Sequence, residues 1–310
     1  MQYFPIFVDG QQLSVLIVGG GEVATRKAEL ILKCPAKVTV ISPDITPSIK
    51  ALADDNKLDY IKGYYDKSLL TGKQLVFVAT ENSILNQQIT EDAKAVNVLA
   101  NVVDNPPLCR FITPSIVDRS PMVFAISSEG KSPVLVRYWR ERLETLLSLN
   151  MGKIASFAGS KRQHIKQKLD SINKRRHFWE VFFSSSRAED PQQVAALYDQ
   201  LIDEVDNEQP ITGELYVVQT PATPDNLTLT ALRHMQKADV AIYDKDISNQ
   251  VLELVRRDAE RELSRNDQPR QIQALLSQGL KVCYLASASG FKQSAEWSIQ
   301  DAKYFKTVND

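Results

Sequence analysis

Cysteine and histidine are scarce in this 310-residue sequence. Its three cysteines, Cys34, Cys109 and Cys283, lie far apart, so they can form neither a disulfide framework nor a paired-cysteine metal site. The three histidines all lie in the second half of the chain. Acid–base or metal chemistry in the first half must therefore use carboxylates, hydroxyls or the backbone.

Long apolar runs are also absent. Nowhere do about 18 consecutive apolar residues occur, and the N-terminus lacks the basic and apolar regions of a signal peptide. Only 12 glycines and 14 prolines are present, which excludes a collagen-like or low-complexity chain. We therefore expect a folded cytoplasmic protein with no membrane partner, and the length predicts about two domains.

The formal net charge of −1 conceals an asymmetry. Residues 1–113 sum to −1, residues 114–187 to +8 and residues 188–310 to −8. The basic middle segment predicts either a polyanionic partner or internal pairing with the acidic C-terminal part, and the charges alone favour neither.

The first third of the chain alternates short β-branched runs with helical patterns. Strands are expected at residues 13–18, 37–41, 58–61, 75–79 and 98–103, and helices at 23–32, 45–53 and 84–95. This alternation predicts an α/β fold, a Rossmann-type doubly wound parallel sheet over residues 1–113.

Three further regions follow this sheet. Strand-like alternation over 115–127 leads into a helix that opens at Ser132 and Pro133, as N-cap and first residue, with an apolar face suited to a core or a dimer interface. The pattern predicts a small helical, basic domain over residues 151–206 and a linker over residues 203–210. Strands at 214–218, 240–243 and 281–285, with a helix at 227–237, predict a partial second α/β unit.

A glycine-rich turn carries the clearest functional signal. Gly19, Gly21 and Ala24 form a G-x-G-x-x-A pattern between a strand and a helix, the context of a dinucleotide-binding turn. The helix N-terminus would bind the pyrophosphate. The alternative is a tight turn without a ligand.

The tip of the second strand indicates the type of cofactor. Residues 41–46 contain no lysine or arginine to receive a 2′-phosphate, which favours NAD over NADP. Asp44, or the backbone at Ser42 and Pro43, would then hold the adenosine ribose.

Polar residues also follow two later strands. Thr80 and Asn101 end strands at the carboxyl edge, where open α/β sheets bind ligands. Asp104 is the one carboxylate there, and its position before Asn105 and two prolines, taken alone, favours the role of a turn former.

Several segments resemble the siroheme synthases. These are residues 4–7, 15–27, 101–104, 111–121 and 126–134, and the similarity runs in register over about residues 1–190. The resemblance implies a precorrin-2 dehydrogenase and sirohydrochlorin ferrochelatase module, an oxidoreductase and lyase of porphyrin biosynthesis. Its expected parts are an NAD-binding domain (1–113), a dimerisation segment (114–150) that forms a homodimer, and a helical domain (151–206).

The resemblance also assigns residue roles. Asp104 matches the family's bifunctional catalytic carboxylate, Ser128 matches its phosphate-accepting serine, and Lys131 and Arg119 lie on the same substrate side. Glu22, Val23, Pro43 and Asp44 match cofactor positions. The tetrapyrrole's eight carboxylates would explain the basic middle segment. Fe(II) would be a substrate without a resident metal site, and no nucleic acid partner is implied.

Residues 211–310 resemble the beginning of the family's uroporphyrinogen-III methyltransferase module. Its first glycine-rich loop is replaced here by residues 219–225, and its second by residues 285–291. We expect a truncated, degenerate remnant without methyltransferase activity. The alternative for the whole chain is a non-catalytic protein that binds NAD or a tetrapyrrole.

Overall fold

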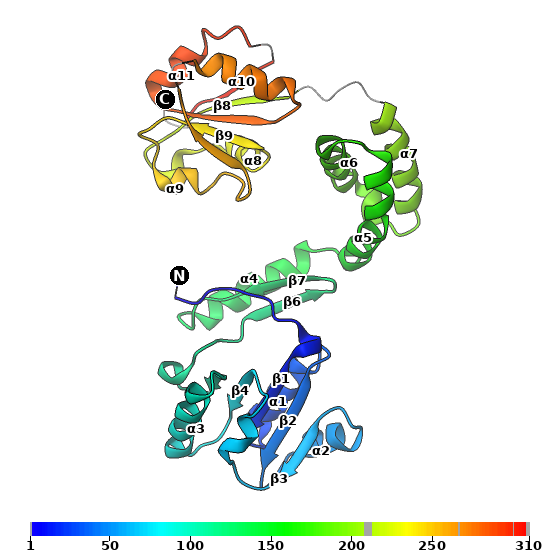
Figure 1. Ribbon diagram of the computed structural model, residues 1–310, viewed down its shortest axis with the longest axis vertical. Helices are drawn as coiled ribbons and strands as arrows, with labels where there is room; N and C mark the ends of the chain where they lie inside the picture. The colour runs from blue at the N-terminus through cyan, green and yellow to red at the C-terminus, as the bar shows by residue number, and fades with distance from the viewer. Residues whose placement is uncertain (1, 208–212, 266, 300, 308–310) are drawn as a thin grey trace. The chain divides into compact units, whose positions relative to one another are not determined.

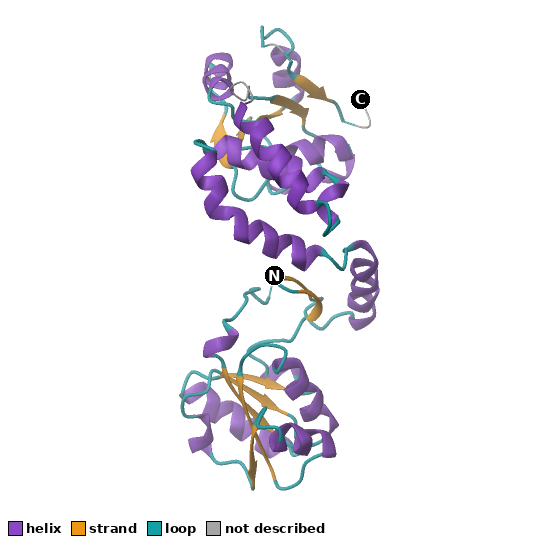
Figure 2. Ribbon diagram, turned by 90° about the vertical axis from the view of Figure 1, so that its right-hand side faces the viewer, coloured by secondary structure: helices purple, strands orange, loops and turns teal. Residues whose placement is uncertain are grey.

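The computed structural model describes residues 2–207, 213–265, 267–299 and 301–307. It divides into two compact units, Met1–Ser148 and Leu149–Asp310, shown from two directions in Figures 1 and 2. Among the described residues, none of the helices combines the length and apolar character that a bilayer crossing requires.

The first unit is built on five parallel strands in the order β3-β2-β1-β4-β5 (Figure 1). The strands are β1 (Ser14–Val18), β2 (Lys37–Ser42), β3 (Asp59–Lys62), β4 (Leu75–Val78) and β5 (Leu99–Val102). The helices are α1 (Glu22–Ile31), α2 (Pro47–Asp54) and α3 (Ser83–Ala95), with short 3₁₀ turns at Gly10–Gln12, Lys67–Leu70 and Pro106–Leu108. The doubly wound parallel sheet predicted from the sequence is confirmed.

Both faces of this sheet are covered, because successive side chains of a strand point to opposite faces. On β1, Val15 and Ile17 pack with residues of α1 and α2, whereas Leu16 and Val18 pack with residues of α3. Burial on both faces explains why the central strands are uninterrupted runs of apolar residues.

A hairpin and a helix complete the first unit. Strands β6 (Ser115–Arg119) and β7 (Met122–Ile126) pair antiparallel, and α4 (Pro133–Leu146) follows. The Ser132 hydroxyl accepts a hydrogen bond from the Leu135 backbone N–H, so the predicted N-cap is confirmed. Trp139 and Leu146 are 46% and 74% exposed, so the first unit leaves part of the apolar face of α4 uncovered.

The second unit begins with three helices. These are α5 (Met151–Lys168), α6 (Ile172–Ser184) and α7 (Val194–Asn207), with a 3₁₀ turn at Ser186–Glu189. Buried Phe178, Phe182 and Tyr198 form their core. The prediction of a linker at 203–210 is wrong for residues 203–207, because α7 continues through them; residues 208–210 lie outside the described part of the chain.

The second sheet is more complete than the sequence predicted. Five parallel strands run in the order β10-β9-β11-β8-β12: β8 (Leu215–Gln219), β9 (Val240–Tyr243), β10 (Glu260–Leu263), β11 (Val282–Ala286) and β12 (Lys303–Phe305). Helices α8 (Leu229–Met235), α9 (Asn249–Leu252), α10 (Gln268–Ser277) and α11 (Ala288–Ser294) and a 3₁₀ turn at Pro224–Asn226 connect them. The two missed strands, β10 and β12, lie at the edges and lack the apolar pattern of the central strands.

Candidate functional site

The glycine turn follows β1 and is shaped by close backbone contacts. Gly19 has a φ of +118°, and an added Cβ would collide with the Ala79 carbonyl oxygen. A Cβ on Gly20 would collide with the carbonyl oxygen of Asp44. At Gly21, in contrast, no atom lies within 4 Å of the added Cβ. The fold itself therefore requires glycine at positions 19 and 20, whereas position 21 is open.

Helix α1 begins directly after this turn. Its N-cap, Gly21, is extended and provides no side-chain hydrogen bond to the first turn. The backbone N–H groups of that turn are therefore available to a phosphate, which the positive end of the helix dipole also favours.

The tip of β2 lies beside the turn, since Gly20 packs against Ser42 and Asp44. The Tyr60 hydroxyl donates to the Ser42 carbonyl oxygen at 3.0 Å and approaches that of Pro43 at 3.4 Å, which fixes the tip. Asp44 is exposed, so its carboxylate is open to a ribose hydroxyl.

A cleft of about 1050 Å³ lies in the first unit, between the sheet and the β6–β7–α4 region. Five of the residues predicted from the sequence line it: Val23, Asn101, Asp104, Ser128 and Lys131. The other predicted cofactor residues do not line it and lie along the carboxyl edge of the sheet: Gly19, Gly21, Glu22, Ser42, Pro43, Asp44 and Thr80. The first turn of α1, through Val23, connects the two groups.

Asp104 lies two residues beyond the end of β5, with a φ of +56°. The loop that carries it is closed by the Cys109 thiol, whose sulfur accepts from the Val102 N–H at 3.3 Å. Asn101 donates to the Phe111 carbonyl oxygen at 2.9 Å and reinforces the same loop. Asp104 is thus both a turn residue and a carboxylate at the cleft, so the two sequence interpretations do not exclude each other.

The Ser128 loop is fixed from both sides. The Ser128 hydroxyl accepts from the Ser132 N–H at 3.0 Å, at the start of α4. The Glu129 carboxylate accepts from the backbone N–H of Gln2 at 2.6 Å, and this bond holds the pKa of Glu129 below its usual value. The loop therefore has a defined conformation at the edge of the cleft.

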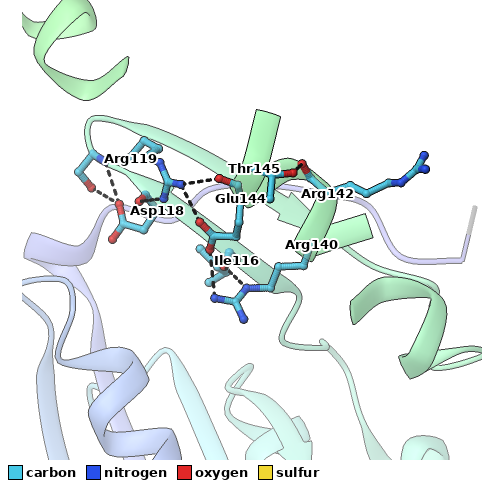
Figure 3. Close-up of polar contacts among 8 residues, drawn as sticks. Ile116, Asp118, Arg119, Arg140, Arg142, Glu144 and Thr145 are labelled. Atoms are coloured by element: carbon cyan, nitrogen blue, oxygen red, sulfur yellow. Dashed lines mark hydrogen bonds and ion pairs between the residues drawn. The ribbon is translucent and has the colours of Figure 1, made fainter. Parts of the chain in front are cut away.

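Two predicted side chains are engaged elsewhere. Arg119 forms an ion pair with Glu144 at 2.7 Å, is only 10% exposed and is not among the described residues that line the cleft. Figure 3 shows that Arg140, at 3.2 Å, shares the same carboxylate. The Thr80 hydroxyl is bonded to the side-chain oxygen of Asn86 at 2.5 Å. The structure therefore does not bring Arg119 together with the other predicted substrate residues.

The cleft also contains basic residues that received no role from the sequence. Each of two helices presents four residues to it at i, i+3, i+4 and i+7: Val23, Arg26, Lys27 and Leu30 on α1, and Pro133, Val136, Arg137 and Arg140 on α4. With Lys131, the described lining has five basic and two acidic side chains, a formal excess of three positive charges. The helical spacing of these residues is visible in the sequence, but it does not indicate which face of each helix lines the cleft.

The carboxyl edge of the second sheet is filled by its own side chains. Asp244 accepts from the Ser287 N–H at 2.8 Å, the Ser287 hydroxyl at 2.6 Å and the Tyr284 hydroxyl at 2.8 Å. Burial alone would raise the pKa of Asp244, but these hydrogen bonds outweigh it and lower that pKa. The segment after β8 takes the place of the family's glycine-rich loop. In it, the Thr220 hydroxyl donates a hydrogen bond to the Ala286 carbonyl oxygen at 2.9 Å.

Internal ion pairs account for part of the basic middle segment. Arg176 of α6 pairs with Asp239, which also binds Arg256 at 3.2 Å, and Lys281 pairs with Glu180. Pairing of the basic middle segment with the acidic C-terminal part, one of the two alternatives for the charge asymmetry, thus holds at Arg176, whereas Lys281 and Glu180 pair with the opposite polarity. Among the described residues, no group of three or more histidine, cysteine or carboxylate side chains could hold a metal ion.

Known proteins resemble both units. Residues 6–115 match a family described as putative NAD(P)-binding, and residues 150–202 match the sirohaem synthase dimerisation region. The chain is 48% identical to a siroheme synthase of Pseudoalteromonas atlantica over 269 residues, 84% of this chain and 58% of that protein. It is 41% identical to a siroheme synthase of Psychrobacter sp. over 310 residues, 94% of this chain and 63% of that protein.

A solved structure titled "SirC, precorrin-2 dehydrogenase" has the same fold over 66% of this chain and all of its own, with a TM-score of 0.52 and 19% identity. The chain spans about three fifths of the length of the curated relatives it matches. The sequence similarity, which continues through the glycine turn, the Asp104 loop and the helical region, shows that this chain is a homologue of the siroheme synthases over most of its length.

Proposed function

We propose that the first unit oxidises precorrin-2 to sirohydrochlorin with NAD, and that the same cleft then inserts Fe(II) to give siroheme. The observation that carries the proposal is the position of Asp104, in a cleft with a positively charged lining that begins at the first turn of α1. The glycine turn and the cleft are thereby joined, which a dehydrogenase needs for its cofactor and substrate to meet.

The residues present fit a dinucleotide. The open position at Gly21 lets a pyrophosphate approach the free N–H groups of α1, and Asp44 is available to the adenosine ribose. The absence of basic residues at 41–46 favours NAD over NADP. When bound, NAD supplies the acceptor for the hydride that leaves the substrate.

The charge of the cleft fits a polycarboxylate substrate. Precorrin-2 and sirohydrochlorin carry eight peripheral carboxylates, and the described lining has five basic side chains. Arginines such as Arg137 can bind a carboxylate through two parallel hydrogen bonds, which fixes orientation as well as position. This distribution of charge supports a tetrapyrrole over a neutral ligand.

Asp104 is assigned the proton transfers of both reactions. During dehydrogenation its carboxylate accepts the proton that the substrate loses as the hydride departs. During metal insertion two N–H protons leave the macrocycle as Fe(II) enters; Asp104 accepts one of them, and the other passes to solvent. Fe(II) is a substrate in this scheme.

A homodimer is part of the proposal. The exposed apolar side chains on α4 support it. The match to a dimerisation region also supports it, although that match covers residues 150–202 and not the segment 114–150 predicted from the sequence. We also propose that Ser128 is a phosphorylation site. Finally, we propose that the second sheet has no methyltransferase activity. The filled edge around Asp244 and the missing glycines after β8 support this last statement.

An anaerobic assay tests the function. The protein is incubated with precorrin-2 and NAD, absorbance is followed for sirohydrochlorin and NADH, and Fe(II) is then added. We expect stoichiometric sirohydrochlorin and NADH, followed by the siroheme spectrum. If NAD and the tetrapyrrole bind by calorimetry but neither product forms, the chain is the non-catalytic binding protein instead. A preference for NADP would overturn the cofactor assignment alone.

A further inference from the structure

Among the five basic residues of the described cleft lining, only Lys27 is half-buried, and the other four are exposed. Arg140 is paired with Glu144 at 3.2 Å, and Lys131 lies 3.9 Å from a Glu129 oxygen. Lys27, on the inward face of α1, has its ammonium 3.5 Å from the Thr113 hydroxyl and 5.3 Å from the centre of the Phe77 ring. Within the described part of the chain, no carboxylate forms an ion pair with it.

This lysine is also partly withdrawn from water. Its side chain is half-buried at the cleft, and burial lowers the pKa of its ammonium group. A partly desolvated charge without an ionic partner is unfavourable in the free protein. An anionic ligand in the cleft would supply the missing partner.

The position of Lys27 relates it to the reacting region. Thr113 and Phe77 contact its ammonium group, and Cys109, which lines the same cleft, closes the loop that carries Asp104. A ligand group held at Lys27 would therefore lie beside the Asp104 loop. The α4 residues Arg137 and Arg140 present their charges from a different helix.

Resting on the proposed function, we infer that Lys27 is a specificity-determining residue that binds one peripheral carboxylate of the tetrapyrrole and so orients the ring toward Asp104. Arg26, the neighbouring lining residue on α1, is more exposed and widens the positive surface around this contact. The subsite selects for a carboxylate at one side of the ring, and the α4 cations bind carboxylates elsewhere on it.

The inference is tested by direct titration with sirohydrochlorin, which requires no turnover. Lys27→Gln should weaken binding about 10- to 100-fold, the range for one hydrogen bond between charged groups, and Lys27→Arg should restore most of it. Lys94→Gln, at an exposed lysine on α3, is the matched control and should bind like the wild type. NAD affinity should be unchanged in all three variants.

Thermal unfolding separates recognition from a structural role. Because the uncompensated charge is removed, Lys27→Gln should melt at the wild-type temperature or above it. Wild-type sirohydrochlorin affinity in Lys27→Gln would overturn the inference, and so would a lowered melting temperature that Lys27→Arg does not restore. If the wild type binds sirohydrochlorin through Lys27 but does not oxidise precorrin-2, the proposed function fails and the inference stands.

Discussion

The chain contains two five-stranded parallel sheets that differ at their carboxyl edges. In the first, glycines 19 and 20 pack tightly, position 21 is open, and the edge adjoins a cleft of about 1050 Å³. In the second, Asp244 accepts three hydrogen bonds from Ser287 and Tyr284. Both edges are at the place where open α/β sheets bind ligands. At the first edge Asp44 and the first-turn N–H groups of α1 are available to a ligand, whereas at the second edge Asp244 is engaged by its own neighbours. Architecture alone therefore does not give a binding site.

The largest expected effect is that of substituting Asp104, the carboxylate beyond the carboxyl end of β5 in the first sheet. Asp104→Asn should slow dehydrogenation about 10²- to 10⁴-fold, because a positioned acid–base group contributes that much, while NAD affinity stays near the wild-type value. Steady-state rates and calorimetric titration measure the two quantities. Asp54→Asn, at an exposed residue of α2, is the control. Wild-type rates in both reactions would return Asp104 to the role of turn residue.

Ligand-induced stabilisation compares the two edges directly. A ligand present at a hundredfold excess over its Kd stabilises the folded protein by about 2.7 kcal/mol. NAD should therefore raise the melting temperature of the first unit, and S-adenosylmethionine should leave the second unit unchanged. A shift with S-adenosylmethionine would show that the edge around Thr220 and Asp244 opens to a nucleoside ligand.

Two glycine substitutions separate the requirements of the fold from those of the cofactor. Gly19→Ala should destabilise the first unit by about 1–3 kcal/mol, since its φ of +118° and the Ala79 carbonyl both oppose a side chain. Gly21→Ala should change the free energy of unfolding by less than about 0.5 kcal/mol but weaken NAD binding. Denaturant titration and calorimetry test this pair, and equal destabilisation by both would contradict it.

The smallest expected effect concerns Asp244 and the free energy of unfolding of the second unit at low pH. The lowered pKa of Asp244 means that its contribution is complete above the unfolded value of about 3.9 and is lost as the pH falls through the folded pKa. Asp244→Asn should destabilise the second unit by about 1 kcal/mol at pH 7 and reduce the loss of stability on acidification. Chemical denaturation at pH 7 and below pH 4 measures this. An unchanged pH dependence would mean that the pKa of Asp244 is the same in the folded and unfolded states, which would contradict the lowered pKa.

The first sheet could be predicted from the sequence because its central strands are buried on both faces and its helices are amphipathic. The edge strand Glu260–Leu263 could not, because half-exposed charged residues lack a strand pattern. At the site, Asp104 and Ser128, which the family resemblance assigned to catalysis and to the substrate side, line one cleft. They could not show that Arg119 pairs with Glu144, 25 residues away, or that Lys27 faces the same cleft.

The contrast between positions 19 and 21 also predicts how the glycine turn changes during evolution. Chain folding selects for glycine at 19 and 20 regardless of what the protein binds, but it exerts no steric selection at 21. In a lineage that stopped using a dinucleotide, position 21 should accumulate other residues first, while its neighbours persisted. We therefore expect glycine at 21 in relatives that bind a dinucleotide, and relatives without it are those in which to test for lost redox chemistry.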